Sequence, residues 1–314
     1  MDPVRGKQIG AWGLCAFSVP AVLYLSRCGW APVLITLMGS GLLVTFGKSP
    51  LRGNSNMAEK VFGAVLFLWN TVILGKLGWE LGRIQGANSQ VPGLLLLILG
   101  AYAVKKRVIP VVGAVLLFFL LGVYGTMLLF GVPNVDPTRL IPAEVEEPGA
   151  LLWGLTPILL LYLNMNGEGT RKRKCQWIMG SGILALGIAA ITQGMGTPDF
   201  YTAAKSINLF GAMERLEPFV ASAVTAGGFC LIGMLFRVNE NIWNEILDLK
   251  KDFPIKWILI LAGVGVFLIP KIGNAFLQVG MSVSWGVIPI LTQLVVARKK
   301  DEKISKKLKK TLDK

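Results

Sequence analysis

The chain has 314 residues, of which 53% are hydrophobic and 16% are charged, with a net charge of +14 and no histidine. Soluble domains carry fewer apolar and more charged residues, so the composition excludes an ordinary water-soluble fold and favours an all-α integral membrane protein. The lack of histidine removes the commonest general base and the commonest zinc ligand. We therefore expect no enzyme, no metal centre and no other cofactor.

Ten stretches are apolar enough to be candidate membrane spans, although two of them are short. In chain order they are residues 9–25, 31–46, 61–81, 93–104, 109–130, 150–165, 176–191, 218–236, 257–270 and 275–297. The first lacks a small-residue cleavage site, so we expect a span there and not a signal peptide. The spans form one transmembrane domain, residues 1–297, followed by a basic tail at 298–314.

The basic residues give an independent test of this span count, because cytoplasmic loops are enriched in Lys and Arg. With ten spans and a cytoplasmic N-terminus, 25 of the 32 basic residues fall in inside segments. Both termini are therefore expected in the cytoplasm. The basic tail is expected to lie on anionic lipid of the inner leaflet, and not on nucleic acid. The four cysteines form no CxxC pair and predict no disulfide.

The ten spans divide into two halves of five, residues 1–131 and 150–297, joined by a Pro-rich acidic outer loop at 132–149. Because each half has an odd number of spans, the second half crosses the membrane in the opposite direction. One large class of transporters has such a five-plus-five inverted repeat and holds its ligand at the midplane, between discontinuous helices in matching positions. In this chain, helices 1 and 6 are the candidates for the two discontinuous helices.

Helix breakers stand at corresponding places in these two spans, with Pro20 in the first and Pro157 in the sixth. Freed backbone groups there could bind the carboxylate and ammonium of a small zwitterion. The predicted ligand-binding residues are Gly10, Gly13, Phe17, Ser18, Asn70, Trp153, Gly154 and Thr156. The alternative is that Gly and Pro serve packing and kinks, and that in-span polar residues such as Asn70 form interhelical hydrogen bonds.

A second polar site is predicted in the outer segment at 193–217. Residues 208–217 predict an amphipathic helix that carries Glu214, Arg215 and Glu217. Charges at the membrane rim usually find partners, so these three residues predict a gate or a structural ion pair. The plainer interpretation is a solvated, capped helix start.

Four stretches follow the pattern of a known family, in order over nearly the whole chain. They are residues 4–10 with Pro20, 101–107, 136–142 and 204–217. The last is the most specific, since Glu-Arg-Leu-Glu leads into a helix that contains Gly227 and Gly228. In these features the chain resembles the B subunit of bacterial spore-germination receptors, of the amino acid–polyamine–organocation superfamily.

The resemblance implies a ten-helix fold of inverted repeats and a subunit that senses a small germinant, such as an amino acid, through a transporter-like core. It also implies A and C receptor subunits as partners, and the inner spore membrane or the bacterial cell membrane as the location. The alternative function is an amino-acid permease that works by alternating access. Proton coupling would need a carboxylate at the midplane, whereas Glu80, Glu214 and Glu217 lie toward the outer rim.

Overall fold

The structure, a computed structural model, is all-α throughout the part of the chain that it describes. That part comprises residues 3–35, 37–38, 57–84, 90–106, 109–141, 171–207, 216–247, 253–268 and 279–280. About 90% of it is helical, and no strand occurs within it. The predicted fold class is confirmed at this level.

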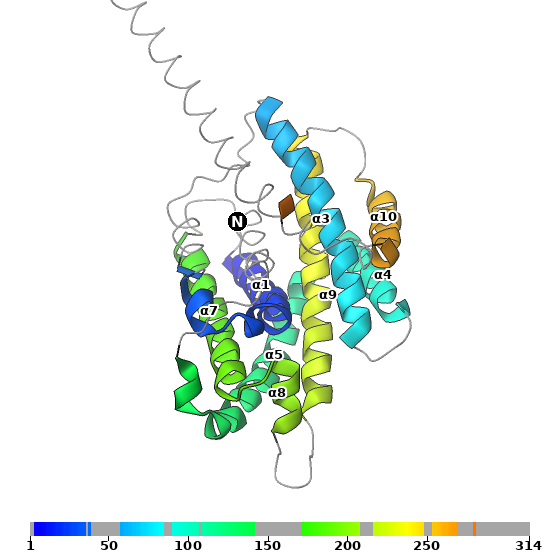
Figure 1. The fold of residues 1–314 in the computed structure, drawn as a ribbon. Coiled ribbons are helices and arrows are strands. Elements are labelled where there is room, and N and C mark those ends of the chain that lie inside the picture. Colours follow the sequence, from blue (N-terminus) through cyan, green and yellow to red (C-terminus); the bar gives the residue numbers. More distant parts are fainter. Residues whose placement is uncertain are drawn as a thin grey trace, which may run out of the picture.

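The longer helices follow the predicted spans in order (Figure 1). They are α1 (Pro3–Leu23), α3 (Met57–Ile84), α4 (Val91–Lys105), α5 (Ile109–Gly131), α7 (Arg171–Gly194), α9 (Glu217–Asn241) and α10 (Ile255–Leu268). The shorter elements are η1 (Leu25–Arg27), η2 (Val132–Asn134), η3 (Pro137–Leu140), α8 (Phe200–Ser206) and the π-helical turn η5 (Ile242–Ile246). Of the predicted span at 31–46, residues 31–35 and 37–38 are described and helical, whereas the span at 150–165 lies wholly outside the described residues and the span at 275–297 almost wholly.

Three described helices are long and apolar enough to cross a membrane: Lys60–Ile84, Val111–Asn134 and Glu217–Asn244. The surface of the second is strongly apolar, since Phe118 is 79% exposed and Leu129 is 75% exposed. So large an apolar surface on one helix is typical of contact with lipid. The protein therefore has the helices and the surface of a membrane protein, and the ten-span count stays a prediction.

Helix α9 lies between two groups of helices (Figure 1). On one side α9 packs against α1 and α5, which also contact α7. On the other side it packs against α3 and α4, which also contact α10. Within the first group α1 is enclosed, since every residue from 10 to 22 is buried. The predicted first span is thus the innermost helix of its group.

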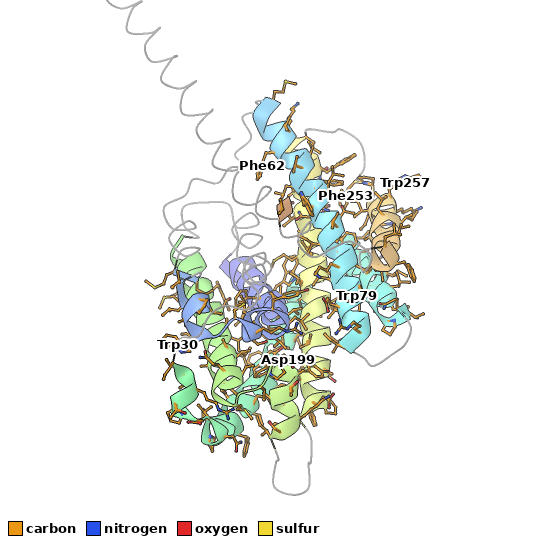
Figure 2. The ribbon with its side chains drawn as sticks, viewed as in Figure 1. Trp30, Phe62, Trp79, Asp199, Phe253 and Trp257 are labelled. Carbon is orange, nitrogen blue, oxygen red and sulfur yellow. The ribbon has the colours of Figure 1, made fainter. Side chains whose placement is uncertain are left out.

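Side-chain contacts fix the directions of neighbouring helices. Gly228 of α9 faces Leu81 of α3, and Asn239 further along α9 bonds to Asn70 earlier in α3, so these helices are antiparallel. The same reasoning places α4 antiparallel to α3, and α1 antiparallel to α9. Figure 2 shows that α10 begins, at Trp257, toward the end of the bundle where α3 begins. These directions agree with the order of alternating spans.

The prediction that the first helix is discontinuous is wrong for the residues that the structure describes. Helix α1 runs as one α-helix from Pro3 to Leu23, with Pro20 inside it. Pro20 lies in the last turn, where the loss of its N–H removes a single bond to an earlier carbonyl. The backbone bond from Tyr24 N–H to Pro20 O, 3.0 Å long, continues the pattern beyond it.

Candidate functional site

Polar groups of the innermost helix α1 are held by backbone carbonyls of its neighbours. The indole Nε1 of Trp12 donates to the carbonyl of Cys230 in α9 over 2.7 Å. The thiol of Cys15 donates to the carbonyl of Gly113 in α5 over 3.2 Å. Ser18 Oγ donates to the carbonyl of Cys15 over 2.7 Å, which leaves its lone pairs as acceptors. These contacts define a polar centre in an otherwise apolar core.

The hydroxyl of Tyr124 completes this centre. Tyr124 comes from α5, is 1% exposed, and packs at 6.3 Å between ring centroids against Phe200 of α8. Its Oη adjoins the Ser18 side chain, yet no hydrogen bond of normal geometry satisfies it among the described residues. A buried hydroxyl without a partner costs free energy, so Tyr124 and Ser18 are the groups at which a small polar ligand would gain most.

The structure places the predicted residues of the first span in this core. Gly10, Gly13 and Ser18 are buried, and Phe17 is 1% exposed. Gly10 lies directly against the indole of Trp177 in α7, so its lack of a side chain serves close packing. The predicted partners Trp153, Gly154 and Thr156 lie outside the described residues, and their part of the site stays a prediction.

Asn70 is in a different part of the molecule from Ser18. Ser18 lies against Gly227 of α9, whereas Asn70 bonds to Asn239, twelve residues further along the same helix. At 1.5 Å per residue the two contacts are about 18 Å apart. Asn70 therefore makes an interhelical hydrogen bond, as the alternative to a ligand contact predicts. Ser18 and Asn70 do not share one pocket.

The second predicted site is only partly described, since Glu214 and Arg215 lie outside the described residues. Glu217, the first residue of α9, forms an ion pair of 3.3 Å with Lys205 of α8. Burial, together with the charge of Glu217, raises the pKa of the nearby Tyr201 to about 12. Glu217 therefore joins α8 to α9 through Lys205, a partner that the sequence pattern alone does not indicate.

Helix α8 (Phe200–Ser206) is not among the predicted elements, since within the segment 193–217 the sequence predicts a helix at 208–217 alone. Its first turn is capped by Asp199, whose carboxylate accepts the N–H of Thr202 over 2.8 Å and its hydroxyl over 3.0 Å. An Asp at the N-cap position is a recognisable signal for the start of a helix. The same carboxylate is 3.9 Å from Arg27, which ties α8 to the turn after α1.

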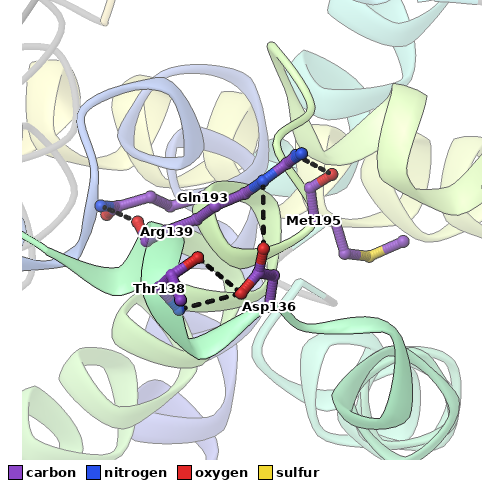
Figure 3. A network of polar contacts seen from close by, with 5 residues as sticks. All are labelled: Asp136, Thr138, Arg139, Gln193 and Met195. Carbon is purple, nitrogen blue, oxygen red and sulfur yellow. Dashed lines mark hydrogen bonds and ion pairs between the residues drawn. The ribbon is translucent and has the colours of Figure 1, made fainter.

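A network of polar contacts joins three segments at one end of the bundle, and Figure 3 shows its part between Gln193 and the loop after α5. Gln193, in the last turn of α7, accepts the N–H of Trp30 over 3.2 Å with its Oε1. Its Nε2 donates to the carbonyls of Arg139 and Ile141, over 2.8 and 2.9 Å. One side chain thus connects the turn after α1, the loop after α5 and the end of α7. We call this the Gln193 clasp.

The loop after α5 is also held by its own side chains (Figure 3). Asp136 accepts the N–H of Thr138 over 3.0 Å and its hydroxyl over 2.7 Å, and these bonds lower the pKa of the carboxyl. The guanidinium of Arg139 is 3.7 Å from Asp136 and donates to the carbonyl of Met195 over 3.3 Å. The loop therefore docks on the end of α7 through fixed polar contacts.

Charged groups also lie within a membrane-spanning helix. Lys76 and Glu80 of α3 form an ion pair of 3.6 Å, with side chains 8% and 18% exposed. Because the two charges neutralise each other, the pair can be accommodated within an apolar helix. Among the described residues no group of three His, Cys, Asp or Glu side chains could hold a metal ion.

Comparison with known proteins gives no further support for any family. No family model matches the chain, and no curated protein matches it. The likeness carried by residues 204–217 and the three other stretches therefore remains an expectation from the sequence.

Proposed function

We propose that this protein is the membrane subunit of a spore germinant receptor, which senses a small ligand such as an amino acid inside a transporter-like helical core. The observation that carries the proposal is the polar centre on α1. There the unpaired hydroxyl of Tyr124 and the lone pairs of Ser18 meet in a buried position. Such groups distinguish a ligand by hydrogen bonding more sharply than apolar walls do.

The grouping of the helices supports a five-plus-five inverted repeat. Helices α3 and α4 correspond to the predicted third and fourth spans of the first half, and they pack with α9 and α10, the predicted third and fourth spans of the second half. The corresponding helices α3 and α9 run in opposite directions. Inversion of the second half relative to the first requires this arrangement.

A permease that works by alternating access is the second candidate. Proton coupling in a permease needs a carboxylate that is free to titrate within the membrane. The carboxylate that the structure describes in α3, Glu80, is paired with Lys76. This pairing favours the sensor over a proton-coupled permease. The proposed partners are the A and C receptor subunits, with anionic lipid at the basic tail.

The test is a paired measurement on purified protein in proteoliposomes. A panel of labelled amino acids is scored separately for saturable binding and for time-dependent uptake. Binding without accumulation is the expected result for the sensor. Accumulation above the binding stoichiometry would instead establish the permease.

Matched variants locate the ligand. Tyr124→Phe and Ser18→Ala each remove one hydroxyl of the polar centre, so we expect at least about tenfold weaker binding, the loss of a hydrogen bond in a buried site. Tyr102→Phe removes a hydroxyl from a side chain that is 59% exposed and should leave binding unchanged. Gly13→Leu and Thr156→Val should abolish binding without loss of protein from the membrane. Unchanged binding in all four site variants would place the ligand elsewhere.

A further inference from the structure

The amides of Asn70 and Asn239 form a buried pair that is only half satisfied. Nδ2 of Asn70 donates to Oδ1 of Asn239 over 2.9 Å, and both residues are 0% exposed. Oδ1 of Asn70 and Nδ2 of Asn239 find no partner among the described residues. Exchanging oxygen and nitrogen in both amides leaves the same pattern: one bond made, with one acceptor and one donor unused.

Leaving these two atoms unpaired is costly. A buried donor or acceptor without a partner costs about 1–3 kcal/mol, and replacing both asparagines by apolar side chains would avoid that cost. An interhelical contact needs only the bond that is made. The unused acceptor and donor therefore match a third group that supplies one donor and one acceptor.

The surroundings favour an uncharged group. Phe67, three residues before Asn70 on α3, packs against Trp243 of η5, with ring centroids 5.8 Å apart. Charge is close by on α9, but Arg237 and Glu240 are paired with each other. Asn70 and Asn239 thus offer neutral hydrogen bonds in a fully buried position, and a charged ligand would lose its hydration there without a counter-charge.

An irregular turn follows this pair directly. Three residues beyond Asn239 the α-helix changes to the π-helical turn η5, closed by a bond of 3.0 Å from Leu247 N–H to Ile242 O. Single π-helical turns occur frequently at functional sites, because they interrupt the regular bonding of the helix. Here the turn carries Trp243, so a change in η5 moves the ring that packs against Phe67 of α3.

We propose that Asn70 and Asn239 form a second binding site, distinct from the polar centre on α1, for a small molecule that carries an uncharged carboxamide. The N–H of the carboxamide donates to Oδ1 of Asn70, and its carbonyl accepts from Nδ2 of Asn239. A primary amide presents this donor and this acceptor on two atoms bonded to the same carbon. The site needs no part of the proposed germinant site, from which it is about 18 Å away along α9.

The test uses the full chain in lipid nanodiscs and propionamide as the probe. Binding is followed by saturation-transfer NMR, with methyl propionate, which lacks the N–H donor, and charged propionate as comparators. The informative variant is the double change Asn70→Leu with Asn239→Leu, which removes both polar partners at similar volume and so keeps the fold. Ser18→Ala and Asn134→Leu, at an exposed residue, are the controls.

We expect saturable binding of propionamide and at least about tenfold weaker binding of both comparators, as the loss of about one hydrogen bond predicts. The double variant should lose binding, while both controls retain it. The inference is overturned if the unmodified protein does not bind propionamide saturably, if the double variant binds equally well, or if methyl propionate binds as tightly. Loss of amino-acid binding in Ser18→Ala with propionamide binding intact separates this site from the proposed function.

Discussion

Asn70 and Asn239 are each other's hydrogen-bond partner in a part of the core where the structure shows both residues fully buried. Either Asn→Leu change alone leaves the remaining amide without a partner and should lower the free energy of unfolding by about 1–3 kcal/mol. The double change should cost less than the sum of the two single changes. Chemical unfolding in detergent measures the free energies of this double-mutant cycle. Strict additivity of the two single changes would mean that the amides are not coupled.

Asp136 acts at the surface, through charge. Its bonds to Thr138 lower the pKa of the carboxyl below the ordinary value of 3.8. The carboxylate therefore contributes stability that is fully present above that value and is lost as the pH falls through the folded-state pKa. Asp136→Asn should remove this pH dependence, with a small effect because the residue is exposed. Melting temperatures between pH 6 and pH 3 compare the two proteins, and identical curves would contradict the prediction.

At the scale of whole elements, α1 and α9 approach closely at one glycine. A Cβ on Gly227 would lie 2.6 Å from Ser18 Oγ and 2.9 Å from the carbonyl oxygen of Cys15. Gly227→Ala should therefore push the two helices apart and cost about 1–3 kcal/mol, which thermal unfolding measures. Gly125→Ala in α5 is the matched control, since a Cβ there meets nothing within 4 Å. It should be neutral or stabilising, and equal loss at both positions would contradict the packing argument.

In the Gln193 clasp, one side chain at the end of α7 binds both the turn after α1 and the loop after α5. Gln193→Ala removes all three bonds, and each typically contributes about 1 kcal/mol, so the loop after α5 should open roughly tenfold more often or more. Trypsin added to the outer face should then cut after Arg139 correspondingly faster. Asn134→Ala loses only its bond to the carbonyl of Phe130 and is the control. Equal cleavage of both variants would mean that the clasp does not restrain the loop.

The sequence was informative where one local signal is sufficient. The lengths of the apolar stretches predict the helices, and the search for helix breakers identifies Gly10 and Pro20. It overestimates the effect of Pro20 on the helix, because a proline in the last turn removes only one backbone hydrogen bond. Asn70 was identified as a polar residue in a span, whereas its partner Asn239 is 169 positions away in the chain. No periodicity connects such residues, so the pair and the polar centre with Tyr124 required the packed structure.

At the scale of the whole molecule, the directions of the described helices lead to a topology test. The loop that carries Thr138 lies at the end of the bundle predicted to face outward, and the tail is predicted to face inward. Thr138→Cys should react with a membrane-impermeant maleimide added outside intact cells, since this side chain is exposed. Ser305→Cys should react only after the membrane is permeabilised. Labelling of Ser305→Cys in intact cells would reverse the predicted orientation.

The position of α9 between two groups of helices has a consequence for synthesis at the ribosome. Helix α1 leaves the ribosome before α9, yet the carbonyl that receives its Trp12 indole belongs to Cys230, which is made more than two hundred residues later. In the interval the indole N–H of Trp12 has no native acceptor in lipid. The early helices must therefore be kept together, by the insertion machinery or by each other, until the last third of the chain arrives. Newly made protein is most vulnerable to quality-control proteolysis in this interval, and α9 is the element whose insertion ends it.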